Sequence, residues 1–204
     1  MLFWQIRLLV ELYLIITNII SQKRTESADL FLILMIHLLK MGGRAGIVLP
    51  DGSLTGDGVK QRIRQKLLED CNLHTIIRLP NSVFKPYATV ATNLLFFTKG
   101  EKTKEIWYYE HRLPEGQKAY NKTKPIQQKE FEPIKKWWNN RVESDICWKV
   151  DIQTIVDRNY DLDIKNPTKQ EEVHEYSSAE LMELLHQSFD NSNGLLNQLK
   201  EAVK

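Results

Sequence analysis

Three short apolar runs between residues 42 and 99 limit what this chain can fold into. Residues 45–49, 74–79 and 93–98 each have the length and apolar content of a strand buried in a sheet. Between the first two runs, residues 58–70 carry apolar side chains at helical spacing, namely Val59, Ile63, Leu67 and Leu68. The region therefore predicts a strand, a crossover helix and a second strand, with a third strand after them.

The direction of the third strand follows from the length of the connection before it. No helix signal separates residues 74–79 from 93–98, and a parallel crossover needs more chain than this, so we predict antiparallel pairing. An earlier helix over residues 27–40 has so few polar side chains that we expect it to be buried on most sides. We expect strand 45–49 to be covered on both faces. The pattern predicts an α/β fold with a mainly parallel sheet and an antiparallel strand near its end.

Composition excludes some classes and leaves others open. A hydrophobic content of 42% supports a packed core, whereas a net charge of +2 is too small to indicate nucleic-acid binding by itself. Cys71 and Cys147 cannot staple a chain of 204 residues, which favours reduced thiols in the cytoplasm. The apolar run 8–20 is interrupted by Glu11 and Asn18 and is shorter than a membrane span. We therefore predict a cytoplasmic protein with no membrane association.

A basic segment lies between Lys118 and Arg141. It carries seven basic side chains against two acidic ones, a local balance of +5, and Tyr120, Trp137 and Trp138 are interleaved with them. These lysines are suited to track a phosphate backbone. A solvated loop followed by a helix that packs its tryptophans inward explains the pattern equally well.

The C-terminal residues predict two amphipathic helices. One begins near Ser177 and has apolar residues at helical spacing, and the sequence Asn191-Ser192-Asn193-Gly194 is expected to end it. A second, short helix then carries Leu195, Leu196, Leu199 and Val203 on one face. Such helices either pack on their own domain or bind a partner.

The residues form no recognisable catalytic constellation, metal site or phosphate-binding glycine loop. Two features remain at one edge of the predicted sheet, where ligands bind in open α/β folds. The first is the strand-end loop Pro50-Asp51-Gly52. The second is the loop after the next strand, Asn81-Ser82-Val83-Phe84-Lys85-Pro86-Tyr87, with two aromatics. We expect both loops to lie on the same sheet edge.

Several stretches of sequence resemble one known family. They are Thr25-Glu26-Ser27-Ala28-Asp29-Leu30-Phe31, the run from Gly42 to Gly52, the run from Asn72 to Pro80, the run from Thr92 to Gly100, Trp107-Tyr108-Tyr109-Glu110-His111, Phe131-Glu132-Pro133, and the run from Asn159 to Pro167. Together they look like the modification subunit of type I restriction-modification systems, which methylates adenine in DNA at N6. The resemblance covers residues 25–170.

The resemblance implies the fold and its divisions. The chain looks like the C-terminal part of a doubly wound, Rossmann-like methyltransferase sheet with an antiparallel last strand, followed by a mixed and helical C-terminal extension. Its divisions would be a divergent apolar segment (1–24), the sheet domain (25–100), a family-specific extension (101–170) and C-terminal helices (171–204).

The resemblance also implies a function and a deficit. In the family, a Gly-rich turn binds S-adenosylmethionine and an Asn/Asp-Pro-Pro-aromatic tetrapeptide is catalytic. Both should precede Thr25, and neither is present. The resemblance therefore implies a truncated adenine methyltransferase subunit with no cofactor of its own, inactive alone, whose partners are DNA and the specificity and restriction subunits. The alternative is a non-catalytic module that docks a subunit or binds DNA.

One functional residue is carried over from the family. Phe84 matches the aromatic side chain that stacks on the adenine flipped out of the duplex. Lys85 and Tyr87 are weaker candidates for contacts with the DNA strand. The competing interpretation is that Phe84 only caps the sheet edge.

Overall fold

A computed structural model describes residues 27–168 and 177–202, in two units that divide after Lys169. The first unit contains α2 (Ser27–Leu38), β1 (Arg44–Pro50), α3 (Asp51–Leu54), α4 (Val59–Asp70), β2 (Cys71–Leu79), β3 (Thr92–Lys99), β4 (Glu105–Glu110), the 3-10 helix η1 (Gln128–Phe131), α5 (Glu132–Asn139), β5 (Cys147–Asp151) and α6 (Ile152–Asp157). The second contains α7 (Ser178–Ala202). The expected segment 1–24 lies outside the described residues.

The strands form one mixed sheet in the order β1-β3-β2-β4-β5. β3 is antiparallel to both β1 and β2, so its predicted direction is confirmed. It lies between them, however, and β5 also runs antiparallel to its neighbour β4, while β2 and β4 are parallel. The expectation of a mainly parallel sheet with the reversed strand near its end is therefore wrong for the described strands. The short β2–β3 connection returns β3 beside β2, and this separates β1 from β2.

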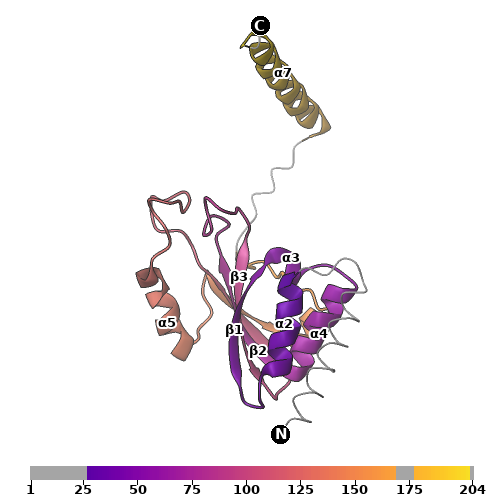
Figure 1. Cartoon of the computed structure of the whole chain (residues 1–204), viewed down its shortest axis with the longest axis vertical. Coiled ribbons are helices and arrows are strands. Elements are labelled where there is room, and N and C mark those ends of the chain that lie inside the picture. Colours follow the sequence, from indigo (N-terminus) through magenta and orange to yellow (C-terminus); the bar gives the residue numbers. More distant parts are fainter. Residues whose placement is uncertain (1–26, 169–176, 203–204) are drawn as a thin grey trace, which may run out of the picture. The chain divides into compact units, whose positions relative to one another are not determined.

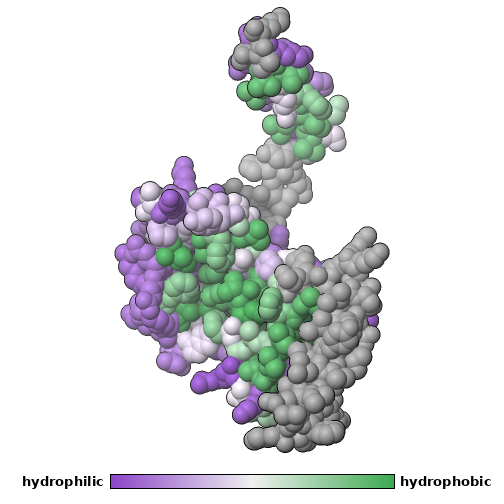
Figure 2. All heavy atoms as spheres, viewed as in Figure 1, coloured by the Kyte–Doolittle hydropathy of each residue, from purple (hydrophilic) through white to green (hydrophobic). Residues whose placement is uncertain are grey.

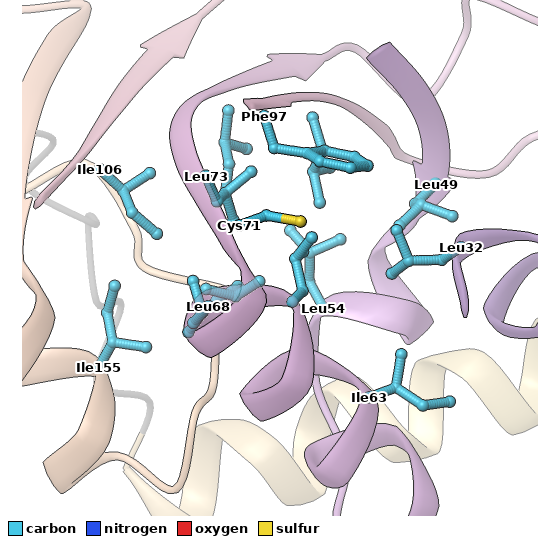
Figure 3. Close-up of a cluster of buried hydrophobic side chains, with 14 of the residues drawn as sticks. Leu32, Leu49, Leu54, Ile63, Leu68, Cys71, Leu73, Phe97, Ile106 and Ile155 are labelled. Carbon is cyan, nitrogen blue, oxygen red and sulfur yellow. The ribbon is translucent and has the colours of Figure 1, made fainter. Parts of the chain in front are cut away.

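Helices cover both faces of the sheet, giving three layers (Figure 1). On one face, α2, α3 and α4 enclose the larger core, in which Leu68, Cys71 and Phe97 are almost fully buried. Figure 3 shows the Cys71 and Phe97 side chains from the strands packed beside Leu54 of α3. Both cysteines are free and buried, as expected for reduced thiols.

The other face carries α5 and a smaller aromatic core. The Trp137 ring meets Tyr109 edge-on at 5.1 Å and Trp107 at 5.9 Å, and Trp138 meets Phe96 at 4.9 Å. Trp137 is only 9% exposed, so its ring serves packing, and Trp138 is partly buried against the same core. The basic segment was predicted either to follow a phosphate backbone or to form a loop and a helix with inward-packed tryptophans. For residues 132–139, which form α5, the structure agrees with the packed helix.

β1 is an edge strand among the described residues, and one of its faces is open. Arg44, Gly46 and Val48 are exposed on that face, so the expected coverage on both faces is wrong. α2 is likewise buried along one side only, because Phe31 is 63% and Leu38 57% exposed. Figure 2 shows hydrophobic side chains gathered where Figure 1 places β1 and α2. Among the described helices, α2 and α3 contact β1, and the face that carries Arg44, Gly46 and Val48 stays open.

The second unit is a single helix, which corrects the predicted break at Asn191-Ser192-Asn193-Gly194. α7 runs without interruption from Ser178 to Ala202. A glycine inside a helix costs only about 1 kcal/mol relative to alanine, so Gly194 is tolerated within a helix of 25 residues. Ser192 also donates to the Ser188 carbonyl at 2.8 Å, a bond made within the helix. In the described ranges, no helix is long and apolar enough to cross a membrane.

Candidate functional site

The candidate site lies where β1, β2 and β4 end. These three strands run in one direction, so their carboxyl ends meet at one edge of the sheet. A cleft of about 350 Å³, called the edge cleft below, opens there. It is lined by Asp51, Arg78, Leu79, Pro80, Ala91, Asn93, Glu110, His111, Arg112 and Leu113. Of the strand-end loop Pro50-Asp51-Gly52, only Asp51 lines this cleft.

Asp51 is fixed by a buried asparagine that the sequence patterns did not single out. Asn93 Nδ2 donates to Asp51 Oδ1 at 2.6 Å, and the Asp51 N–H donates to the Ala91 carbonyl at 3.1 Å. Asn93 is fully buried, and its Oδ1 has no hydrogen-bond partner among the described residues. The cleft wall therefore presents the Asp51 carboxylate, an acceptor for N–H or O–H groups, held in place by Asn93.

Residues 81–87, called the Phe84 loop below, follow directly after β2 and so begin at the same edge of the sheet as the edge cleft. This placement confirms that both predicted loops share one edge. Its turn is built by N–H donation from Lys85 to the Ser82 carbonyl at 3.1 Å and from Tyr87 to the Phe84 carbonyl at 3.0 Å. Ser82 is buried, whereas Phe84 is 42% and Tyr87 91% exposed. None of Phe84, Lys85 and Tyr87 lines the edge cleft.

A buried polar network supports this loop. The Tyr120 hydroxyl donates to Glu130 Oε2, and its oxygen lies 3.0 Å from His111 Nε2. Because the phenol proton goes to Glu130, we assign His111 Nε2 as the donor to Tyr120. Burial lowers the pKa of His111 despite the opposing charge of Glu130, and burial also raises the pKa of Tyr120. The Tyr120 N–H donates to Ser82 Oγ at 3.0 Å, which ties the network to the Phe84 loop.

Two arginines hold the segment that follows α6 against the site. Arg64 Nε donates to the Tyr160 carbonyl at 2.6 Å, and its terminal nitrogens donate to carbonyls of residues 53, 55 and 56. Burial lowers the pKa of Arg64, an effect opposed first by Asp161. Arg78 pairs with Asp163 and donates to the Ile164 carbonyl at 2.9 Å. The sequence patterns singled out neither arginine. Both nevertheless bind residues of the run from Asn159 to Pro167, which carries part of the family resemblance.

The glycine turn before α4 is not arranged as an anion-binding loop. The turn before α4 contains Gly56 and Gly58, both at positive φ, but its carbonyls are taken up by buried Arg64 and, at Gly52, by Lys60. A phosphate- or carboxylate-binding loop instead directs N–H groups at its ligand. Within residues 27–168 and 177–202, no cluster of His, Cys, Asp or Glu side chains is placed to hold a metal ion.

Comparison with known proteins identifies the family. A model of the N-6 DNA Methylase family matches residues 14–176, well over half of the chain. The chain belongs to this family. The chain is also 49% identical over 185 residues to the EcoEI methylase subunit of Escherichia coli, a type I restriction enzyme subunit, covering 87% of this chain and 38% of that one. The resemblance to type I modification subunits is thereby confirmed.

Solved structures agree with this assignment. The modification subunit of a putative type I restriction enzyme from Vibrio vulnificus YJ016 is 42% identical with a TM-score of 0.68, over 75% of this chain and 34% of that one. The crystal structure of the EcoKI M protein is 25% identical with a TM-score of 0.61, over 85% of this chain and 44% of that one. The chain thus spans less than half the length of these relatives.

Proposed function

We propose that this chain supplies the target-base side of an adenine-specific DNA methyltransferase in a type I restriction-modification system. The methyl group would pass from S-adenosylmethionine to N6 of an adenine extruded from the duplex. Its partners would be DNA, a specificity subunit that reads the sequence, and a restriction subunit.

The position of Phe84 carries this proposal. Base-modifying enzymes hold an extruded base against aromatic faces. Phe84 is partly exposed at the carboxyl edge of the sheet. Its loop is anchored by a hydrogen bond between two buried residues, from the Tyr120 N–H to Ser82 Oγ. A ring that only capped the sheet would be expected to lie buried against the strands. Lys85 and Tyr87, exposed in the same loop, are proposed to contact the DNA strand.

We also propose that this chain does not methylate DNA by itself. Transfer to an amino group needs the donor methyl held in line with N6 and acceptors for the amino hydrogens. The sequence contains neither the Gly-rich turn nor the Pro-Pro tetrapeptide of the family. The turn before α4 does not replace them, because its carbonyls bind Arg64 and Lys60.

Replacing Phe84 with alanine tests the target-base role. Residues 27–168 would replace the matching segment of the EcoEI subunit, so that cofactor and catalytic motifs are present. Stacking on one base is worth roughly 1–3 kcal/mol, so we expect Phe84→Ala to lower the methylation rate roughly 5- to 150-fold. Transfer of labelled methyl groups to cognate duplex DNA measures the rate, and calorimetry should show unchanged S-adenosylmethionine affinity.

Two further variants separate stacking from simple coverage of the sheet edge. Phe84→Trp keeps an aromatic face and should retain most of the activity, whereas Phe84→Leu keeps an apolar side chain without one and should resemble Phe84→Ala. Equal activity of the leucine variant and the unaltered chimera would contradict the stacking role, as would unchanged methylation by the alanine variant.

A second candidate function, subunit docking, is favoured by the surface of α7. Its large apolar side chains follow a helical stripe and are all exposed, namely Leu181, Met182, Leu184, Leu185, Phe189, Leu195, Leu196 and Leu199. A long amphipathic helix whose apolar stripe stays exposed gains stability when a partner covers it. We propose that a helix of the specificity subunit packs against this stripe.

Substitutions on opposite sides of α7 test the docking function. Leu185→Asp with Leu196→Asp places two charges in the stripe, and we expect the chain to stop co-purifying with the specificity subunit. Gln187→Asp with Gln198→Asp adds the same charges on the opposite side and should leave co-purification intact. Circular dichroism checks that α7 stays helical. An unaltered chain that remains monomeric in the mixture would reject this function.

A further inference from the structure

Residues 113–127 form a basic connection between β4 and η1 that the proposed function has not used. Lys118, Lys122 and Lys124 are exposed, and Glu115 is the segment's acidic residue. Among the described residues, these three lysines make no ion pair. Their charges are therefore not neutralised by the protein, which leaves them available to an anionic partner.

The segment has a built turn at its tip. Asn121 Oδ1 accepts hydrogen bonds from the Thr123 N–H at 3.0 Å, the Thr123 hydroxyl at 2.8 Å and the Lys124 N–H at 2.8 Å. The Asn121 N–H in turn donates to the Lys124 carbonyl at 3.2 Å. Lys122 and Lys124 thus project from a backbone whose conformation is fixed, which reduces the entropy lost when they bind.

Tyr120 joins this segment to the Phe84 loop. Tyr120 lies between Lys118 and Lys122 in the sequence and is 1% exposed. Its N–H donates to the Oγ of Ser82, the residue two positions before Phe84. Its hydroxyl is held by His111 and Glu130. Figure 1 shows the two connections rising beside each other from one edge of the sheet. The lysines and Phe84 are therefore presented at the same edge.

We propose that residues 113–127 bind the phosphate backbone of DNA beside the extruded base, through Lys118, Lys122 and Lys124. This inference rests on the proposed function, because it takes DNA as the substrate. Lys122 and Lys124 lie on the fixed turn and Lys118 lies just before it. Together they offer three positive charges to the DNA backbone, in which each phosphate carries one negative charge. Such contacts position the strand without reading its sequence.

The salt dependence of DNA binding tests the inference on the full 204-residue chain. Each phosphate contact contributes about −0.9 to the slope of log affinity against log salt concentration. We expect the variant Lys118→Gln, Lys122→Gln, Lys124→Gln to reduce the steepness of this slope by about 2.7, because three contacts are lost. Fluorescence anisotropy with a labelled duplex, from 50 to about 200 mM salt, measures the slope.

A second variant with the same change in charge distinguishes the loss of local phosphate contacts from the loss of net positive charge. Lys40→Gln, Lys102→Gln, Lys104→Gln removes the same charge from exposed lysines at the opposite edge of the sheet, where β1 and β4 begin. Its slope should stay within about 1 of the unaltered chain's. Equal reductions in both variants, an unchanged slope in the first, or no binding of the unaltered chain at 50 mM salt would overturn the inference.

The test is independent of the Phe84 experiment. A reduced slope together with unchanged methylation by Phe84→Ala would reject the stacking role and keep the phosphate contact. An unchanged slope together with lost methylation would reject the phosphate contact and keep the stacking role.

Discussion

Replacing Arg64 with alanine is expected to destabilise the chain by about 3–5 kcal/mol, a larger effect than most single substitutions produce. Arg64 is 2% exposed and donates to four backbone carbonyls, of Ser53, Thr55, Gly56 and Tyr160. Removing its guanidinium leaves buried acceptors without a donor, at about 1–3 kcal/mol for each one that water does not reach. It also leaves a cavity beneath the strand-end loop of the site.

Urea unfolding followed by circular dichroism measures this loss. Arg62→Ala is the matched control, because Arg62 lies on the same helix but is exposed, and an exposed arginine contributes about 1 kcal/mol or less even where it has a partner. Arg64→Lys keeps the charge but not the planar fork of donors, so its loss should fall between the two. If Arg64→Ala unfolds at the same urea concentration as Arg62→Ala, the proposed clamp on the strand-end loop is wrong.

The local elements were predictable because their patterns depend on near neighbours. The stripe of Ile63, Leu67 and Leu68 is buried as expected, and α4 occupies almost the predicted residues. The burial of Arg64 was not predictable in this way, because it depends on carbonyls of residues 53–56 and of residue 160, which only the folded chain brings together. Helical spacing predicts which side of a helix is buried, but it does not predict which buried polar side chain will form hydrogen bonds there.

The sheet illustrates the same limit. The direction of β3 followed from a short connection, which is a local property, and it was correct. Its place between β1 and β2 depends on pairing with β1, which lies much earlier in the chain, and no run of residues encodes that choice. The exposed face of β1 was missed for a related reason: the apolar run 45–49 shows that burial is favourable but not which element provides it.

The candidate site was predicted in outline only. Sequence placed Asp51 and the Phe84 loop at one edge, and the structure agrees. Asn93 was counted only as a strand residue, and Tyr120 as one aromatic among lysines. Their roles arise from contacts across the fold, with Asp51 in one case and with Ser82, His111 and Glu130 in the other. Buried polar partnerships of this kind are long-range and leave no periodic signal.

Replacing Trp137 with alanine is expected to cost about 3–5 kcal/mol, the range for truncating a large buried aromatic side chain. The ring packs α5 onto the sheet against Trp107 and Tyr109, and Nε1 donates to the Val142 carbonyl at 3.3 Å. The Arg141 guanidinium lies 5.4 Å from the ring centroid. Removing the ring therefore uncovers Trp107 and Tyr109 together.

The same experiment decides what the tryptophans of the basic segment do. Trp138 is less buried, so Trp138→Ala should cost less than Trp137→Ala, and exposed Lys136→Ala should stay within about 0.5 kcal/mol. Urea midpoints give these differences. A tryptophan that stacked on DNA would show the reverse behaviour, with little change in the urea midpoint and a large loss of DNA affinity. That result for Trp137→Ala would contradict the packing role, whereas a loss of stability shows that α5 holds the sheet face behind the site.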